Sequence, residues 1–160
     1  MSFTVGFSTH SGLLSWIIRK ITRSEVSHAW VRFRDPVFRT DVILEATALG
    51  FHLTPYDQWI KTNTTVFTRD LPYSLARGLE SVVESLGTRY DVTGLLGMTV
   101  VMVGRWFKRK WLNPLRSSQN VFCSEATTRI LQGAGVPGAR QFDPSSTTPQ
   151  DLLDFVRQLP

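Results

Sequence analysis

The sequence contains one cysteine, Cys123, and only three histidines among its 160 residues. A single thiol cannot form a disulfide within the chain, so Cys123 is free for chemistry or for packing. Neither a paired CxxC nor an HExxH pattern is present, so we assign no metal and expect no cofactor. A glycine-rich phosphate loop is missing, as is the nucleophile elbow that a serine triad would need.

Long hydrophobic runs are missing too. The longest apolar stretch, residues 92–103, is interrupted by Gly94, Gly97 and Thr99. It is well short of the about 20 residues that span a bilayer, so we expect a buried helix. The N-terminal segment has no basic stretch followed by an apolar one, which predicts a chain that is cytoplasmic at synthesis. Hydrophobic residues make up 42% of the sequence, enough for one domain over residues 1–160.

The net charge of +5 invites a polyanionic partner, but basic residues are dense only between positions 105 and 116. Aromatic residues are interleaved with them there, a composition that suits an anionic surface. Because the remaining positive charge is scattered, we expect no specific nucleic-acid partner. The residues predicted to face an anionic surface are Arg105, Lys108, Arg109 and Lys110.

The apolar periodicity predicts a mixture of strands and helices. Alternating runs predict short strands at residues 3–7, 28–33, 41–46, 51–54 and 64–69. A first helix, capped by Thr9 or Ser11, is expected to end near Arg23. Further helices are expected at residues 72–86, from 91 onward, at 121–132 and from 149 onward. The predicted fold class is α+β, with an antiparallel sheet packed against helices.

Two of these helix starts carry specific signals. Asn120 can cap the helix at residues 121–132, which places Cys123 in its first turn. The last helix begins with Thr148 as its cap, Pro149 at the first helical position and Asp151 three residues after the cap.

The position of Cys123 suits a nucleophile. A free thiol has a pKa near about 8.5, and a helix N-terminus together with a nearby imidazolium stabilises the thiolate. His28 at the start of a strand could serve as the base. A third polar group would then fix the orientation of the imidazole ring, and Glu45 at the end of the next strand could provide it.

The pairing of the two strands decides whether Glu45 reaches His28. Our hypothesis is a register in which paired residue numbers sum to 73, which places the two residues directly opposite each other; the sequence permits this register but does not dictate it. This register leaves residues 34–39 as the loop, and a slip by one residue would move Glu45 to the other face. Each residue also has an ordinary structural interpretation. A cysteine near a helix start is commonly small core filler, and a strand glutamate commonly faces solvent.

Several short motifs, in this order, resemble a known family. They are Gly6-Phe7-Ser8, Ser27-His28-Ala29-Trp30, Leu44-Glu45-Ala46, Tyr90-Asp91, Phe122-Cys123-Ser124-Glu125 and Thr148-Pro149-Gln150-Asp151-Leu152. Together they resemble the permuted NlpC-type papain-like cysteine hydrolases, and the YiiX-like and YebB-like proteins look nearest. In that group the histidine strand precedes the cysteine helix, as it does here. The resemblance implies a papain-like fold with Cys123 as nucleophile, His28 as base and Glu45 as the orienting residue.

The resemblance also implies an activity, a thiol-dependent hydrolysis of amide bonds, with those of peptidoglycan peptides as one substrate class. Cleavage or transfer of lipid and other ester acyl groups is the alternative within the same fold. A third reading is a non-enzymatic binding or structural module of an assembly such as a phage tail tip. The expected partners are accordingly a peptide or acyl substrate, or virion components. The expected destination is the virion or the cell envelope.

Overall fold

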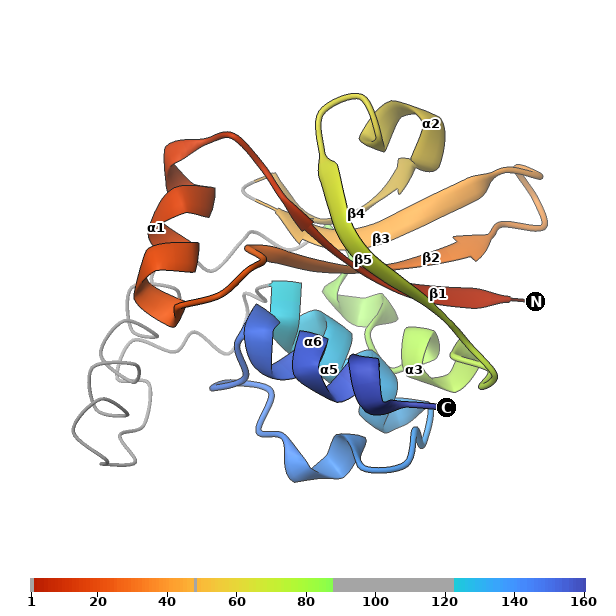
Figure 1. Ribbon diagram of the computed structural model, residues 1–160. Helices are drawn as coiled ribbons and strands as arrows, with labels where there is room; N and C mark the ends of the chain where they lie inside the picture. The colour runs from red at the N-terminus through yellow and green to blue at the C-terminus, as the bar shows by residue number, and fades with distance from the viewer. Residues whose placement is uncertain (1, 48, 88–122) are drawn as a thin grey trace.

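The computed structural model describes residues 2–47, 49–87 and 123–160, in which a five-stranded antiparallel sheet packs against helices. The sheet has the strand order β4-β3-β2-β1-β5 (Figure 1). Its strands are β1 (Phe3–Thr9), β2 (His28–Arg34), β3 (Asp41–Thr47), β4 (Gly50–Pro55) and β5 (Thr64–Leu71). The fold class predicted from the sequence, α+β with an antiparallel sheet, is confirmed at this level.

The helices are distributed unequally over the sheet. Those described are α1 (Leu13–Thr22), α2 (Tyr56–Trp59), α3 (Ala76–Glu80), α5 (Cys123–Gly133) and α6 (Pro149–Gln158), with 3-10 turns at Val83–Ser85 and Ala139–Gln141. Figure 1 shows α3, α5 and α6 together on one side of the sheet, α2 on the other, and α1 at one end. No helix among the described residues is long and apolar enough to cross a membrane.

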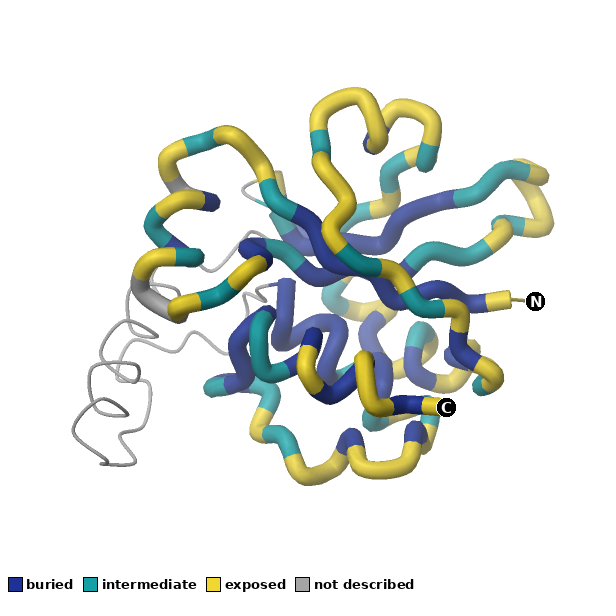
Figure 2. The backbone as a smooth tube through the Cα atoms, viewed as in Figure 1, coloured by how far each residue is buried: buried dark blue, intermediate teal, exposed yellow. Residues whose placement is uncertain are grey.

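The helix-covered face of the sheet holds the main core. Along β1 the odd-numbered residues Phe3, Val5 and Phe7 are fully buried there, as the period of two in a strand requires. Leu131 of α5 and Leu153 of α6 pack into the same core and are fully buried. Figure 2 shows the buried backbone gathered where the sheet and these helices meet.

The opposite face of the sheet carries a much smaller apolar cluster, made of Trp30, Ile43 and Trp59. The rings of Trp30 and Trp59 meet edge to face with centroids 4.9 Å apart. Trp30 also pairs with Gly6 across β1 and β2, and its indole ring occupies the space where a side chain at Gly6 would begin. A glycine is therefore required at position 6 as long as Trp30 keeps this place.

The pairing of β2 with β3 differs from the prediction. Val31 lies opposite Leu44 and Phe33 opposite Val42, so the paired numbers sum to 75 rather than 73. The predicted register is wrong by two residues. Because side chains alternate with a period of two, a shift of two keeps His28 and Glu45 on the same face and makes them diagonal neighbours.

Two helix predictions are also corrected. The cap of α1 is Gly12, with no side-chain hydrogen bond, rather than Thr9 or Ser11. The single helix expected at residues 72–86 is instead the short α3, which packs against α5, followed by a 3-10 turn at Val83–Ser85. Residues 88–122 lie outside the described part of the chain. They include the helix expected from position 91, the cap at Asn120 and the basic segment.

The beginning of α6 agrees with its sequence. The Thr148 hydroxyl accepts a hydrogen bond from the Asp151 amide at 3.1 Å, and the Asp151 carboxylate accepts one from the Thr148 amide at 2.9 Å. Pro149 occupies the first helical position. The predicted capping box is confirmed, and it fixes where the last helix joins the core.

Candidate active site

His28 is the first residue of β2, beside Ser8 of β1. It has the same parity along the strand as Trp30, so its side chain leaves the strand on the face opposite the main core. Its Nε2 lies 2.8 Å from Oε2 of Glu45. The structure thus brings the two predicted residues into direct contact, although they are diagonal rather than opposite in the sheet.

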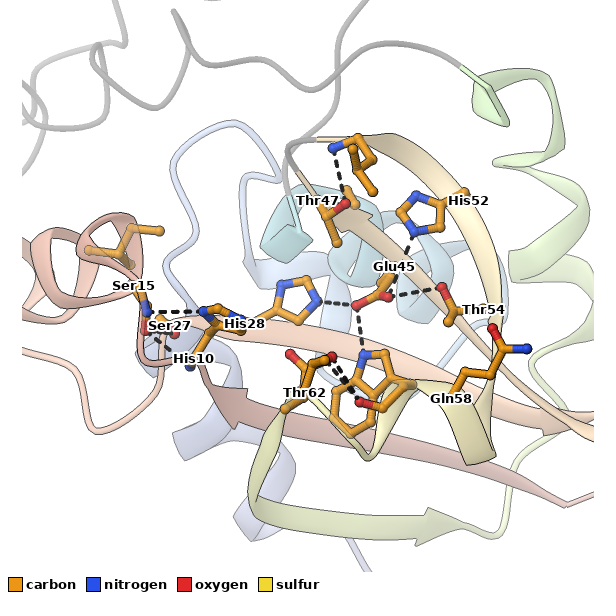
Figure 3. Close-up of a pocket in the computed structure, with 16 residues that line it drawn as sticks. His10, Ser15, Ser27, His28, Glu45, Thr47, His52, Thr54, Gln58 and Thr62 are labelled. Atoms are coloured by element: carbon orange, nitrogen blue, oxygen red, sulfur yellow. Dashed lines mark hydrogen bonds and ion pairs between the residues drawn. The ribbon is translucent and has the colours of Figure 1, made fainter.

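Glu45 is a buried carboxylate with several partners (Figure 3). Besides His28, the Trp59 indole nitrogen donates to its Oε2 at 2.9 Å and the Thr54 hydroxyl donates to its Oε1 at 3.1 Å. Burial alone would raise the pKa of Glu45, but these hydrogen bonds and the charge of His28 lower it below its usual value. The carboxylate is therefore ionised, and its position is fixed by donors from three sides.

Cys123 begins the described part of α5 and is buried. Its Sγ lies 4.0 Å from the carbonyl oxygen of Ser27, the residue just before the base. Burial raises the pKa of Cys123, but the hydrogen bond and charge of His28 outweigh it and lower the pKa below that of an ordinary thiol. The backbone amides of Ala29 and Ser124 lower it further.

The three groups act on one another as a chain. Burial lowers the pKa of His28, yet its hydrogen bonds and charge interactions with Cys123 and Glu45 raise it to about 10. A lowered thiol pKa beside a raised imidazole pKa favours a thiolate–imidazolium pair at neutral pH. Since Nε2 of His28 is held by Glu45, Nδ1 is the nitrogen left to exchange a proton with Cys123.

A cavity of about 460 Å³ opens beside His28 and Glu45. Its walls come from both sides of the site, as Figure 3 shows with Ser15 on one side and His52 on the other. The described residues that line it carry no lysine, arginine or aspartate. Its one carboxylate, Glu45, is already occupied by hydrogen bonds. This composition suits an uncharged group with scattered hydrogen-bonding atoms.

Smaller polar contacts shape the same cavity. The hydroxyls of Ser15 and Ser27 are hydrogen-bonded at 2.7 Å, and the amide of His10 donates to the Ser15 hydroxyl at 3.2 Å. His52 faces Glu45 across β3 and β4, with Nε2 3.8 Å from Oε1. Within the described residues no three metal-binding side chains come together.

Sequence reasoning named Cys123, His28 and Glu45, and the structure brings all three together. It missed Thr54 and Trp59, which hold the carboxylate. The signal for Thr54 was available, because it lies two residues after His52 on the same side of a predicted strand. Trp59 had no such signal, since it lies in a helix of only four residues.

No protein-family model matches the chain, and no curated protein matches it in sequence.

Proposed function

We propose that this protein is a thiol-dependent hydrolase of the permuted NlpC type, with a papain-like fold and a Cys123, His28 and Glu45 triad. The observation that supports it most is the buried carboxylate of Glu45, 2.8 Å from the imidazole of His28, whose charge in turn lowers the pKa of Cys123. A packing cysteine would need neither partner. A solvent-facing glutamate would not hold three hydrogen bonds from buried or half-buried side chains.

The proposed reaction is acyl transfer. The thiolate of Cys123 attacks the substrate carbonyl carbon, and the backbone amide of Cys123, with one further donor, stabilises the oxyanion. The imidazolium of His28 protonates the leaving amine as the carbon–nitrogen bond breaks, which leaves a thioester and a neutral imidazole. Water then gives a proton to His28 and attacks the thioester. Collapse releases the acid, and the ion pair forms again.

Glu45 has a positioning role in this scheme. It fixes the ring of His28 through Nε2 and stabilises the imidazolium by charge. Trp59 and Thr54 in turn fix Glu45. The scheme serves amide bonds, including those of peptidoglycan peptides, and acyl esters alike, because both pass through the same thioester. The substrate class is decided by assay of matched amide and ester substrates carrying the same acyl group.

The first experiment measures the rate at which iodoacetamide alkylates Cys123 as a function of pH. We expect rapid labelling near pH 6, because the thiol pKa is lowered. His28→Ala should move the profile toward that of a free thiol. His10→Ala is the matched control, since His10 lines the same cavity and should leave the profile unchanged. A wild-type rate no faster than that of the unfolded chain, at every pH, would refute the proposal.

A further inference from the structure

One side of α1 exposes apolar side chains to solvent next to the cavity. Leu13 is 73% exposed and Trp16 is 51% exposed, one turn apart on the helix. Two large apolar side chains that adjoin on one outward stripe form a contiguous exposed patch, the kind of surface that binds proteins or membranes. Lys20, one turn further along, is also exposed and continues the stripe.

A third exposed apolar residue lies at the same cavity. Leu49, between β3 and β4, is 91% exposed and lines the cavity wall. From α1, Gly12, Ser15 and Ile18 line the cavity as well. The cavity therefore opens between α1 and Leu49. We refer to four residues together as the rim: Leu13, Trp16, Lys20 and Leu49.

The charge around the rim points to the chemistry of the partner. Between His10 and Ser24 the chain has three basic residues and no acidic one. A symmetric contact between two copies through α1 would bring like charges together, which disfavours a second copy of the chain. Leucine and tryptophan side chains beside a lysine are the composition of helices that lie in the headgroup region of a bilayer.

We propose that the rim docks on an anionic lipid bilayer, with its leucines and tryptophan inserted at headgroup depth and Lys20 beside acidic headgroups. Docking would turn the mouth of the cavity, and with it His28, toward the lipid surface. This inference does not require the thiol chemistry, because it concerns binding alone. It can therefore be tested in Cys123→Ala protein, where loss of catalysis cannot be confused with loss of docking.

The test is co-flotation of the full chain with vesicles of phosphatidylcholine and phosphatidylglycerol, and with phosphatidylcholine vesicles alone. The rim variant combines Leu13→Ser, Trp16→Ser and Leu49→Ser. We expect it to lower partition into the mixed vesicles at least about tenfold, since it removes the inserted apolar surface. Lys20→Gln should lower binding about fivefold on the mixed vesicles and leave the neutral vesicles unaffected.

The chain offers a matched control. Val37 and Phe38, in the turn between β2 and β3, are 79% and 74% exposed, and Figure 1 shows this turn at the opposite end of the sheet from α1. Val37→Ser combined with Phe38→Ser should change partition by less than about twofold, because these side chains do not reach the bilayer. Circular dichroism melts of all variants confirm that folding is intact.

A second measurement localises the contact. Vesicles with brominated acyl chains quench the fluorescence of tryptophans near the bilayer. The part of the quenching that disappears in Trp16→Phe reports the position of Trp16 alone. Equal quenching in wild type and Trp16→Phe would overturn the proposal. So would undiminished binding of the rim variant, or equal losses in the rim variant and the control. Failure of the wild-type protein to bind the mixed vesicles would also overturn it. If the wild-type protein then self-associates and the rim variant does not, the rim is assigned to contact with a second copy of the chain.

Discussion

The two faces of the sheet bury different kinds of side chain. The helix-covered face buries a broad apolar core that includes Phe7, Leu131 and Leu153. Among the described residues, the other face buries the three large apolar side chains Trp30, Ile43 and Trp59, and beside them a carboxylate, Glu45, held by hydrogen bonds. The apolar core is therefore concentrated on one face, and the proposed catalytic groups His28 and Glu45 lie on the other. His28, the first residue of β2, and Cys123 lie where the two faces meet.

The largest effect should follow from removing the residue at this junction. His28→Ala eliminates the proton acceptor and the imidazolium that lowers the pKa of Cys123. We expect turnover to fall about a thousandfold or more, and the melting temperature to fall as well, because the buried carboxylate of Glu45 loses its imidazolium partner. Steady-state kinetics beside a thermal melt checks both statements. Turnover within about tenfold of wild type would place the base elsewhere.

The helix-covered face should show a different pattern. Leu153→Ala in α6 leaves a cavity in the main core, and such changes cost about 2 to 5 kcal/mol of unfolding free energy. At a temperature where the variant remains folded, the alkylation rate of Cys123 should equal that of wild type. Urea unfolding and the labelling assay test the pair of expectations. A changed labelling rate in the folded variant would show that the two faces are coupled.

Glu45→Gln should act between these extremes. The amide keeps the size of the side chain but loses the charge that stabilises the imidazolium, so turnover should drop roughly ten- to a hundredfold. The thiol pKa should rise less than in His28→Ala. Full activity with an unchanged labelling profile would mean that Glu45 has no part in the site.

The same substitution has a pH signature in stability. The folded pKa of Glu45 is lowered from 4.5, so its ionised form stabilises the fold above that pH and the contribution is lost as pH falls. The difference in unfolding free energy between wild type and Glu45→Gln should therefore shrink as acid is added. A difference that stays constant down to acid unfolding would argue that the carboxylate contributes nothing by its charge.

The smallest effect is expected at Trp59. Trp59→Phe preserves most of the ring contact with Trp30 but removes the indole donor 2.9 Å from Glu45. We expect a loss of about 1 kcal/mol in stability and a few-fold loss in turnover. Thr54→Val, which removes the other donor, is the matched comparison. Larger losses from Trp59→Phe than from Glu45→Gln would contradict the order of roles proposed here.

Sequence patterns predicted the strands well, because the alternation along segments such as β1 has a single physical cause, burial of one face. They predicted the capping box of α6 for a similar reason, since its residues are local. The triad followed from short motifs and from the resemblance. The register of β2 with β3 could not be fixed, because a shift by two residues preserves the buried face and leaves the pattern unchanged.

The other differences between prediction and structure come from contacts between segments that are distant in the sequence. The helix expected at residues 72–86 has suitable periodicity, but α3 is limited to Ala76–Glu80 by packing against α5, where Gly78 closely approaches the carbonyl of Ile130. Likewise, the indole donor to Glu45 comes from Trp59, which the chain brings there through α2. Contacts between distant segments are tertiary, and no local pattern encodes them.

The contact of Gly6 with Trp30 constrains how this sequence can change over evolution. Any side chain at position 6 would displace the indole ring, and with it Trp59, whose nitrogen holds Glu45. Positions 6 and 30 should therefore covary among homologous chains, a larger residue at the first appearing only where the second is small. Such correlated pairs would identify relatives of this protein that have kept the contact between Trp30 and Trp59 after the surrounding sequence has diverged.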